Sequence, residues 1–318
     1  MAVTISATHT VTVDSVTMLS DGVVELQLVG EDLPAWTAGA HIDIELPSGT
    51  VRQYSLCGDP ADRERYTIAV LKEPNGRGGS REVHEAVHAG QQLKIRGPRN
   101  HFELGDHDGY LFIAGGIGIT PILAMVRTVA AARKPWKLVY GGRTLSSMAY
   151  LDALDRVPGG EVKVVPQDTH GYPDLDGALS QAGTWHVYTC GPEPLLQAVD
   201  QATRRILGSG VLHFERFGAD PDAVLEDDSD APFRVELAQS GVTLDVGSRE
   251  RLIDVVRRVV PTVPFSCEEG YCGSCETAVL AGVPLHRDSV LTPDEREAND
   301  TMMICVGRSK TPVLQLDI

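Results

Sequence analysis

Four cysteines in the C-terminal part of the 318-residue chain have a spacing that strongly limits how this part can fold. Cys267, Cys272 and Cys275 follow the pattern C-x4-C-x2-C, and Cys305 comes after 29 further residues. At this spacing four thiolates hold a [2Fe–2S] cluster, three from one tight loop and the fourth from a separate strand. We therefore predict that these four cysteines are iron ligands.

Two other uses of the cysteines fit the sequence less well. A zinc ribbon normally pairs two short C-x2-C units, and the chain has one. Disulfides are disfavoured, because a chain of this length without a recognisable export signal is expected in a reducing compartment. Gly270 and Gly273 favour a cluster, since glycine lets backbone N–H groups approach the sulfurs closely.

The residues before the cysteine loop also have a regular pattern. The runs 233–237 and 242–246 alternate in hydrophobicity and predict a hairpin. A helix is predicted next, capped by Ser248 and burying one face that consists of Leu252, Val255, Val256 and Val259. With the cysteine spacing, residues 233–318 resemble a plant-type ferredoxin domain. A cluster with four thiolate ligands has no open site, so its chemistry is the transfer of single electrons.

The N-terminal third of the chain alternates between apolar and polar residues, as half-buried strands do. Turn residues separate the runs, and helical periodicity is confined to residues 80–89. We expect a small antiparallel β-barrel. Its predicted strands are 9–16, 23–30, 41–49, 65–73 and 91–98, with a further strand at 52–56.

From Tyr110 the pattern changes to alternating strands and helices. An apolar run at 110–114 is followed by a glycine turn and an amphipathic helix, for which we expect Thr120 as N-cap and Pro121 as first helical residue. The pattern predicts a parallel sheet covered by helices on both faces. Its further strands are predicted at 136–142, 162–167, 185–191 and 211–217, and its helices at 147–156, 176–181 and 193–207.

Charge and hydropathy exclude some classes of function. The chain has 28 Lys and Arg against 44 Asp and Glu, a net charge of −16, so nucleic-acid binding is not expected. No apolar run reaches the ~18 residues that a membrane span needs, and residues 1–14 lack the features of a signal peptide. We expect a soluble, cytoplasmic protein. The acidic residues 220–232, with Pro221 and Pro232, predict a linker.

Two turns are candidates for binding a nicotinamide dinucleotide. The sequence GGIGITP does not match G-x-G-x-x-G, so a purely structural turn is the alternative. Between a buried strand and a helix, however, such a turn offers backbone N–H groups and a positive helix end to a pyrophosphate. Its candidate residues are Gly115, Gly116, Gly118, Thr120 and Pro121. In the second turn, Cys190-Gly191-Pro192, the cysteine either belongs to the core or lines a nicotinamide pocket.

Two segments of the predicted barrel are candidates for a phosphate site. In Arg52-Gln53-Tyr54-Ser55-Leu56, strand alternation puts Arg52 and Tyr54 on one side and Gln53 and Ser55 on the other. Taken alone, this is also an ordinary strand with a surface arginine. Residues 76–80, GRGGS, precede a helix and offer glycine N–H groups and a hydroxyl to an anion, although a mobile loop has the same composition.

Together these motifs resemble the ferredoxin–NADP reductase superfamily. RQYSL is similar to the flavin-binding element of that superfamily, GGIGITP to its dinucleotide turn and CGP to its nicotinamide-side turn. The order of domains resembles phthalate dioxygenase reductase and vanillate demethylase reductase, and the reductase part of self-sufficient P450 fusions. The resemblance implies an FMN-binding β-barrel domain (1–107), an NAD(P)-binding α/β domain (108–219), the acidic linker (220–232) and a plant-type [2Fe–2S] ferredoxin domain of the β-grasp type (233–318).

The resemblance also implies roles for individual residues. Ser55 would lie near the flavin N5, with Cys190 and Phe217 at the contact between flavin and nicotinamide, as catalytic residues. Tyr54 would pack on the flavin ring, whereas Phe214 is expected in the core. FMN rather than FAD is expected, because this branch of the superfamily binds FMN and no adenine platform is apparent. The predicted cofactor-binding residues are Arg52, Gln53, Tyr54, Ser55, Gly78, Gly79, Ser80, Gly115, Gly116, Gly118, Thr120, Pro121, Gly191 and Pro192.

The implied function is to pass electrons from NADH through FMN and the cluster, one at a time, to a separate terminal oxygenase. That partner is expected to be a Rieske-type aromatic oxygenase or demethylase, with a cytochrome P450 as the alternative. The resemblance implies NADH, although Arg143, Thr144, Ser146 and Ser147 after the second sheet strand permit NADPH. A redox sensor without turnover and a zinc-stabilised flavin oxidoreductase are further alternatives. The sequence does not identify the oxygenase, its substrate or the oligomeric state.

Overall fold

The computed structural model describes residues 8–74, 76–218 and 229–318. The chain divides into two compact units, Ala7–Arg216 and Phe217–Ile318, which we describe separately. Most of the predicted linker, residues 220–228, lies outside the described residues. Among the described residues, no helix is long and apolar enough to cross a membrane.

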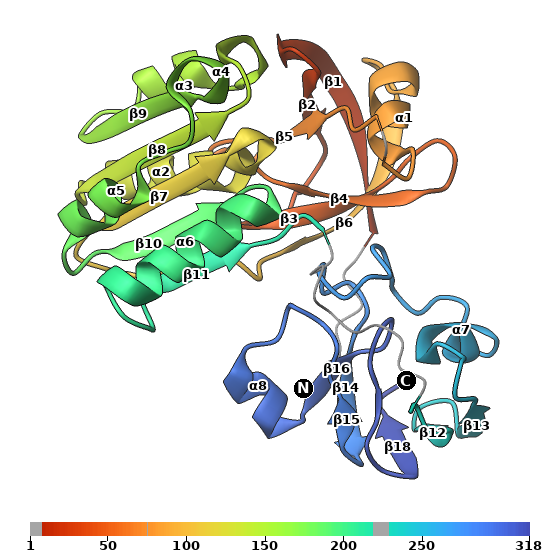
Figure 1. The fold of residues 1–318 in the computed structure, drawn as a ribbon. Helices are drawn as coiled ribbons and strands as arrows, with labels where there is room; N and C mark the ends of the chain where they lie inside the picture. Colours follow the sequence, from red (N-terminus) through yellow and green to blue (C-terminus); the bar gives the residue numbers. More distant parts are fainter. Residues whose placement is uncertain (1–7, 75, 219–228) are drawn as a thin grey trace. The chain divides into compact units, whose positions relative to one another are not determined.

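The first unit begins with a six-stranded antiparallel sheet (Figure 1). Its order is β4-β3-β6-β1-β2-β5, and a bridge between Leu56 and Ile68 joins the two edges, which closes the sheet into a barrel. The predicted antiparallel barrel is therefore confirmed. Its elements are β1 (Thr8–Ser20), β2 (Val23–Val29), β3 (His41–Glu45), β4 (Val51–Ser55), β5 (Arg65–Leu71), α1 (Gly79–Ala86) and β6 (Gln92–Arg99).

The rest of the first unit is a five-stranded parallel sheet, as predicted, and its strand order is β11-β10-β7-β8-β9. Its strands are β7 (Tyr110–Gly115), β8 (Trp136–Gly142), β9 (Gly160–Pro166), β10 (His186–Cys190) and β11 (Leu212–Glu215). Between them lie the helices η1 (Gly116–Gly118), α2 (Ile119–Ala131), η2 (Leu145–Ser147), α3 (Leu151–Asp155), α4 (Gln167–His170), α5 (Leu175–Ala182) and α6 (Glu193–Ile206).

Alternate side chains of β7 face opposite helix layers. Leu111 and Ile113 pack in the cluster that contains residues of α5 and α6, whereas Phe112 and Ala114 pack with residues of α2 and α3. All six residues of β7 are buried, as expected for a central strand of a covered parallel sheet. The strand order reverses between β7 and β10, so the carboxyl ends of these two strands form the crevice where such sheets bind ligands.

Two local predictions in this sheet are wrong. The N-cap of α2 is Gly118 rather than Thr120, because a turn of 3-10 helix precedes it and the Thr120 hydroxyl donates to the Ile117 carbonyl, 3.0 Å away. The helix predicted at 147–156 is two short pieces, η2 and α3, separated by residues that include Tyr150 with a φ of 64°.

The barrel and the parallel sheet share one hydrophobic core, which contains Ile42 and Leu56 from the barrel and Phe112 and Met125 from the α/β part. A partly buried polar chain also connects them: the Tyr150 hydroxyl donates to Glu25 at 2.8 Å and lies 3.1 Å from the Cys57 sulfur. The predicted boundary between residues 107 and 108 falls between β6 and β7, and it stays a prediction.

The second unit contains a mixed sheet, β13-β12-β18-β14-β16, and a short β15–β17 pair. The pairing of β12 with β18 is parallel, while β13, β14 and β16 pair antiparallel with their neighbours. The elements are β12 (Phe233–Leu237), β13 (Val242–Val246), α7 (Leu252–Arg257), β14 (Glu276–Ala281), β15 (Pro284–Leu285), α8 (Pro293–Ala298), β16 (Thr301–Met303), β17 (Arg308–Ser309) and β18 (Val313–Leu316).

The predicted hairpin is β12–β13, but the predicted cap of the next helix is wrong. Helix α7 begins at Leu252 with Arg251 as N-cap, so Ser248 lies in the turn before it. Val259 follows the helix and is 39% exposed, whereas Leu252, Val255 and Val256 are buried in the core of this unit.

Candidate functional site

The four predicted iron ligands come together in the second unit. Cys267, Cys272 and Cys275 belong to the loop between α7 and β14, and Cys305 follows β16 by two residues. All four are buried and none forms a disulfide. Side-chain hydrogen bonds connect Cys267 with Cys272 and Cys305, and Cys305 with Cys275.

The chemistry of this donor set fits a [2Fe–2S] cluster. The Cys267 thiol raises the pKa of Cys272 and burial adds to that shift, so four thiolates packed this closely require a bound cation. Backbone N–H groups already point at the sulfurs: Glu269 donates to Cys267 at 3.3 Å and Ser274 to Cys272 at 3.5 Å. Such donors stabilise cluster-bound sulfur.

Backbone geometry requires glycine at two positions of the cysteine loop. Gly270 and Gly273 have φ values of 75° and 71°, in the left-handed region that glycine adopts without strain. At Gly270 a Cβ atom would also lie 2.7 Å from the side chain of Val306, beside the fourth ligand. The loop and the end of β16 therefore pack too closely for a side chain here.

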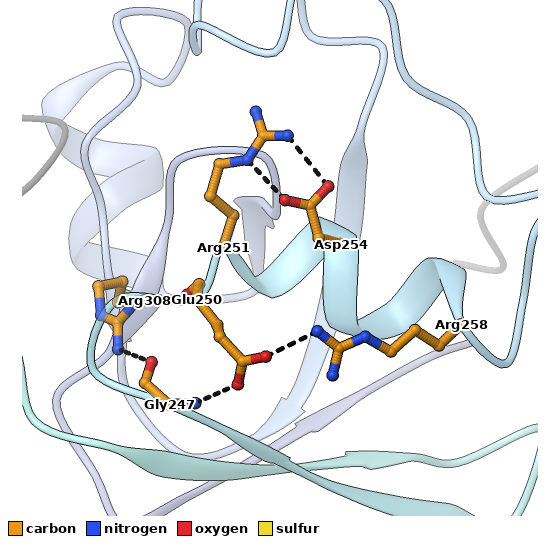
Figure 2. Close-up of polar contacts among 6 residues, drawn as sticks. All are labelled: Gly247, Glu250, Arg251, Asp254, Arg258 and Arg308. Atoms are coloured by element: carbon orange, nitrogen blue, oxygen red, sulfur yellow. Dashed lines mark hydrogen bonds and ion pairs between the residues drawn. The ribbon is translucent and has the colours of Figure 1, made fainter.

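A polar network fixes the turn and helix that lead into the loop (Figure 2). Glu250 accepts from the Gly247 N–H at 2.9 Å and pairs with Arg258 at 2.6 Å, which ties the β13–α7 turn to the end of α7. Arg308, three residues after the last cysteine, is buried and donates to the carbonyls of Gly247 and Glu250. Arg251 pairs with both Asp254 and the loop residue Glu268, each at 2.8 Å.

In the first unit, the two predicted dinucleotide turns lie against each other at the carboxyl ends of β7 and β10. A Cβ atom on Gly118 would lie 2.3 Å from the Cys190 carbonyl oxygen, and one on Gly115 would lie 2.8 Å from Pro192. A Cβ atom on Gly191 would in turn lie 3.0 Å from the Cα of Gly115. Glycine is therefore required so that the two backbones can touch, and their N–H groups share one crevice.

Ser55 and Cys190 also come together, and the structure adds a residue that the sequence reasoning missed. Glu215, the last residue of β11, pairs in register with Cys190, and Ser55 donates a hydrogen bond to its carboxyl group. Burial raises the pKa of Glu215 to about 8, partly offset by the Ser55 bond. An acidic residue at the end of a predicted parallel strand was the available signal.

Burial determines the protonation of Cys190 and Glu215. Burial raises the pKa of the Cys190 thiol, and the Glu215 carboxyl group raises it further. Both groups therefore stay protonated at neutral pH. Oxygen Oε2 of Glu215 is buried without a hydrogen-bond partner, which is a sign that a bound group completes the site.

The predicted phosphate-binding residues also meet. The Arg52 side chain covers the start of α1, since a Cβ atom on Gly79 would lie 2.5 Å from its Nε. Gly78 is the N-cap of α1, with a φ of 88° and no side-chain capping bond, so the first N–H groups of α1 need another acceptor. Ser80 instead accepts from the Glu73 N–H at 3.0 Å. An anionic flavin phosphate fits this combination of a guanidinium group and an uncapped helix start.

The remaining predicted flavin residues lie on the same strand, β4. Tyr54 is half-buried, and burial raises the pKa of its hydroxyl, so the ring is neutral and able to pack on an apolar group. Gln53 contacts Asp43 at 3.5 Å. Their contacts with a flavin stay predictions.

Of the two aromatic residues near the end of β11, Phe214 differs from the expectation. Phe214 is 42% exposed instead of lying in the core, and the Arg216 guanidinium lies over its ring at 4.7 Å. Phe217 is 40% exposed and belongs to the second unit, so its expected place near the flavin stays a prediction.

Comparisons with known families and proteins agree with both units. Residues 235–310 match a 2Fe-2S iron-sulfur cluster binding domain and residues 112–201 an oxidoreductase NAD-binding domain. The chain is 40% identical to a phthalate 4,5-dioxygenase oxygenase reductase subunit of Pseudomonas putida, covering 95% of this chain and 94% of the relative. It is also 40% identical to a vanillate O-demethylase oxidoreductase of Pseudomonas putida, covering 92% and 94%.

Solved structures resemble the chain over its whole length. A phthalate dioxygenase reductase structure, described as modular for electron transfer from pyridine nucleotides to [2Fe-2S], has a TM-score of 0.69 at 34% identity and covers 98% of each chain. An intact type IV self-sufficient cytochrome P450 monooxygenase gives 0.89 at 39% identity, but this chain spans only 41% of its length. The chain therefore belongs to the phthalate dioxygenase reductase and vanillate demethylase reductase family of NAD(P)H-dependent oxygenase reductases, which join flavin, NAD-binding and [2Fe–2S] ferredoxin domains.

Proposed function

We propose that the chain passes electrons from NADH through FMN and a [2Fe–2S] cluster to a separate Rieske-type oxygenase or demethylase that acts on an aromatic substrate. The observation that carries the proposal is the presence in one chain of a buried four-cysteine site and a glycine-lined dinucleotide crevice. When bound, the flavin takes the electron pair of a hydride and the cluster accepts electrons singly.

The chain's own residues would first bind and orient the nicotinamide nucleotide. The N–H groups of the turn from Gly115 to Thr120, at the start of α2, would hold the pyrophosphate. Cys190, Gly191 and Pro192 would form the wall against which the nicotinamide lies. Because the two turns touch, movement of one would displace the other.

Ser55, Cys190 and Glu215 would shape the place where hydride is transferred. Ser55 and Cys190 are buried, which excludes water from the reacting atoms. With its thiol protonated, Cys190 presents a neutral surface to the nicotinamide. Glu215 holds the Ser55 hydroxyl by a hydrogen bond and thus orients it.

FMN is supported by the anion site at Arg52 and the start of α1. The guanidinium lies against Gly79, so one terminal phosphate would satisfy both the charge and the uncapped helix N–H groups. We infer that FMN is the flavin on this ground and on the similarity to phthalate dioxygenase reductase.

NADH is supported by the residues after β8. Thr144 and Ser147 form a reciprocal capping box at η2, and the Thr144 hydroxyl also lies 3.2 Å from that of Ser146. These hydroxyls already form hydrogen bonds within their own turn. A 2′-phosphate would therefore find one partner among the four candidate residues, the side chain of Arg143. We expect a higher kcat/KM for NADH than for NADPH in steady-state ferricyanide reduction.

A cytochrome P450 is the second candidate partner. The high structural similarity to part of a self-sufficient P450 monooxygenase favours it, because an equivalent electron chain serves a haem protein there. Reconstitution with a Rieske oxygenase and with a P450, each with its own substrate, would separate the candidates by product formed per NADH consumed.

Anaerobic titration with NADH tests the proposed electron path. Complete reduction of one flavin and one cluster takes three electrons, so we expect both absorption bands to bleach with about 1.5 NADH per chain. Electron paramagnetic resonance should then detect a reduced [2Fe–2S] centre. Unchanged spectra in protein loaded with both cofactors would overturn the proposal.

A further inference from the structure

Three histidines converge at the amino-terminal edge of the parallel sheet. His107 precedes β7, His186 begins β10 and His213 is the second residue of β11. Each offers one ring nitrogen, and the three nitrogens all lie within 4.8 Å of one another. Among the His, Cys, Asp and Glu side chains of residues 8–74, 76–218 and 229–318, these three histidines meet this 4.8 Å limit.

The three histidine rings contact one another and Tyr188. His186 Nδ1 and His213 Nε2 are 3.0 Å apart, and the rings of His107 and His186 stack with centroids 3.4 Å apart. His107 Nε2 lies 3.0 Å from the Tyr188 hydroxyl, which also accepts from the Gly105 N–H. The His213 ring stacks on Tyr188 at 4.4 Å.

The surroundings lower the pKa of two of the three imidazoles, His107 and His213. Burial, together with His186 and His107, lowers the pKa of His213 to about 4. Burial and His186 also lower the pKa of His107, while Asp106 and Asp108 act in the opposite direction. Lys134 pairs with the exposed Asp106 and donates to the His107 carbonyl. All three histidines are partly exposed, so an ion can reach them from solvent.

We propose that His107, His186 and His213 bind one divalent transition-metal ion, for which Zn²⁺ is the best match. In a tetrahedral site with Zn–N bonds of 2.0–2.1 Å, the nitrogens lie about 3.3 Å apart, close to the His186–His213 separation found here. The stacked rings of His107 and His186 are nearly parallel, so the His107 ring must turn for its nitrogen to face the same ion. Three imidazoles leave the fourth position to water. Nitrogen donors also exclude Mg²⁺ and Ca²⁺, which require oxygen ligands.

The position of the site indicates a structural role. His186 and Cys190 are the two ends of β10, so the ion would lie about 13 Å along the strand from the nicotinamide crevice. It would connect β10, β11 and the segment before β7. Without the ion, these parts are held together by contacts within the sheet. The ion is therefore expected to stabilise the first unit without taking part in hydride transfer.

Calorimetric titration of the holoprotein with ZnCl₂ tests the proposal. The cysteines must be occupied, as shown by two irons per chain, so that they do not capture Zn²⁺. We expect one Zn²⁺ per chain and no heat with MgCl₂. His186→Gln and His213→Gln should each weaken binding roughly tenfold or more, since each removes one ligand. His88→Gln, an exposed histidine of the same unit, is the matched control and should bind as the wild type does.

Thermal unfolding provides a second readout. All three tryptophans, Trp36, Trp136 and Trp185, belong to the first unit, so their fluorescence reports its unfolding. Zn²⁺ should raise the unfolding temperature of the wild type and of the His88 variant, but not of the other two. Ferricyanide reduction by NADH shows that each variant is folded. If the wild-type holoprotein does not bind Zn²⁺, or if all variants bind it equally, the proposal is wrong.

Discussion

Glu215 ends β11 with a buried carboxyl group whose pKa is raised to about 8, against 4.5 for an ordinary glutamate. Between these two pH values the native protein keeps the proton while the unfolded chain has lost it. The free energy of unfolding therefore falls as the pH rises through this window, by up to about 1.4 kcal/mol per pH unit, and levels off above pH 8. One residue thus makes the first unit more stable in mild acid.

Glu215→Gln should remove this part of the pH dependence, because the amide does not titrate. Urea unfolding at pH 5.5, 6.5 and 7.5, followed by the fluorescence of Trp36, Trp136 and Trp185, measures the slope. The control is Glu161→Gln, an exposed residue at the start of β9, which should keep the wild-type slope. Equal slopes in all three proteins would show that Glu215 ionises normally.

Gly118→Ala should disrupt the nicotinamide crevice. The new Cβ atom would lie 2.3 Å from the Cys190 carbonyl oxygen, and backbone on both sides prevents a small adjustment. We expect a loss of roughly 1–3 kcal/mol in stability, together with a rise in the KM for NADH. Gly218→Ala, where a Cβ atom meets nothing within 4 Å, is the control and should be nearly neutral.

At this scale the sequence predicted residues whose chemistry depends on spacing. The four cysteines are buried together and the two glycine turns touch, as their local patterns suggested, while the groups that they would bind stay predictions. Glu215 could not be assigned, because its role follows from burial beside Cys190 and Ser55, which are distant in the sequence. The histidine trio was missed for the same reason, because it forms only when β10 and β11 pair and lie beside the segment before β7.

Among the elements, α1 depends most on a residue outside itself. Its first turn has no side-chain cap, and Arg52 of β4 covers it. In the sequence, β5 lies between β4 and α1. The two parts of the anion site therefore meet only when the barrel has closed. Flavin binding and barrel formation are therefore expected to be coupled.

Arg52→Gln should weaken flavin binding roughly tenfold or more, because it removes a charged partner of the phosphate. Flavin released on dilution, measured by its fluorescence, gives the dissociation constant. Arg63→Gln is the matched control, since Arg63 is an exposed arginine of the same barrel. If both variants retain flavin equally, Arg52 does not bind the phosphate.

Strands were predicted more accurately than the starts of helices. In the barrel strands, apolar and polar residues alternate, and β7 is a continuous apolar run. Both patterns reflect burial directly, and burial determines these strands. Caps depend on a single hydrogen bond. Thr120 bonds backward to Ile117 instead of capping, and α7 begins three residues after the predicted N-cap would have started it. Short α8, with its Thr292–Glu295 capping box, was overlooked.

At the scale of the whole molecule, the chemistry is divided between the units. The proposed nicotinamide crevice and the proposed flavin residues Arg52 to Ser55 belong to Ala7–Arg216, while the four-cysteine site belongs to Phe217–Ile318. An assay that takes electrons from the flavin and one that takes them from the cluster should therefore report on different parts of the chain. The sequence indicated this division through the order of its motifs, although not the placement of one unit on the other.

Cys272→Ser should abolish the NADH-dependent reduction of cytochrome c, while NADH–ferricyanide activity persists through the flavin. Serine replaces one of the four thiolates, so the cluster is lost. Cys57→Ser is the matched control, because Cys57 is buried far from the four ligands in sequence and belongs to the first unit. Undiminished cytochrome c reduction in Cys272→Ser would show that electrons leave directly from the flavin.

The shared core of the barrel and the parallel sheet has a consequence for engineering. The apolar residues of 233–318 form a core of their own, whereas Ile42, Phe112 and Met125 belong to one continuous cluster. Among the described residues, a chimera joined after Arg216 would replace the second unit together with its own complete hydrophobic core. A joint between β6 and β7 would instead cut through packed side chains, so recombination should succeed at the first seam and fail at the second.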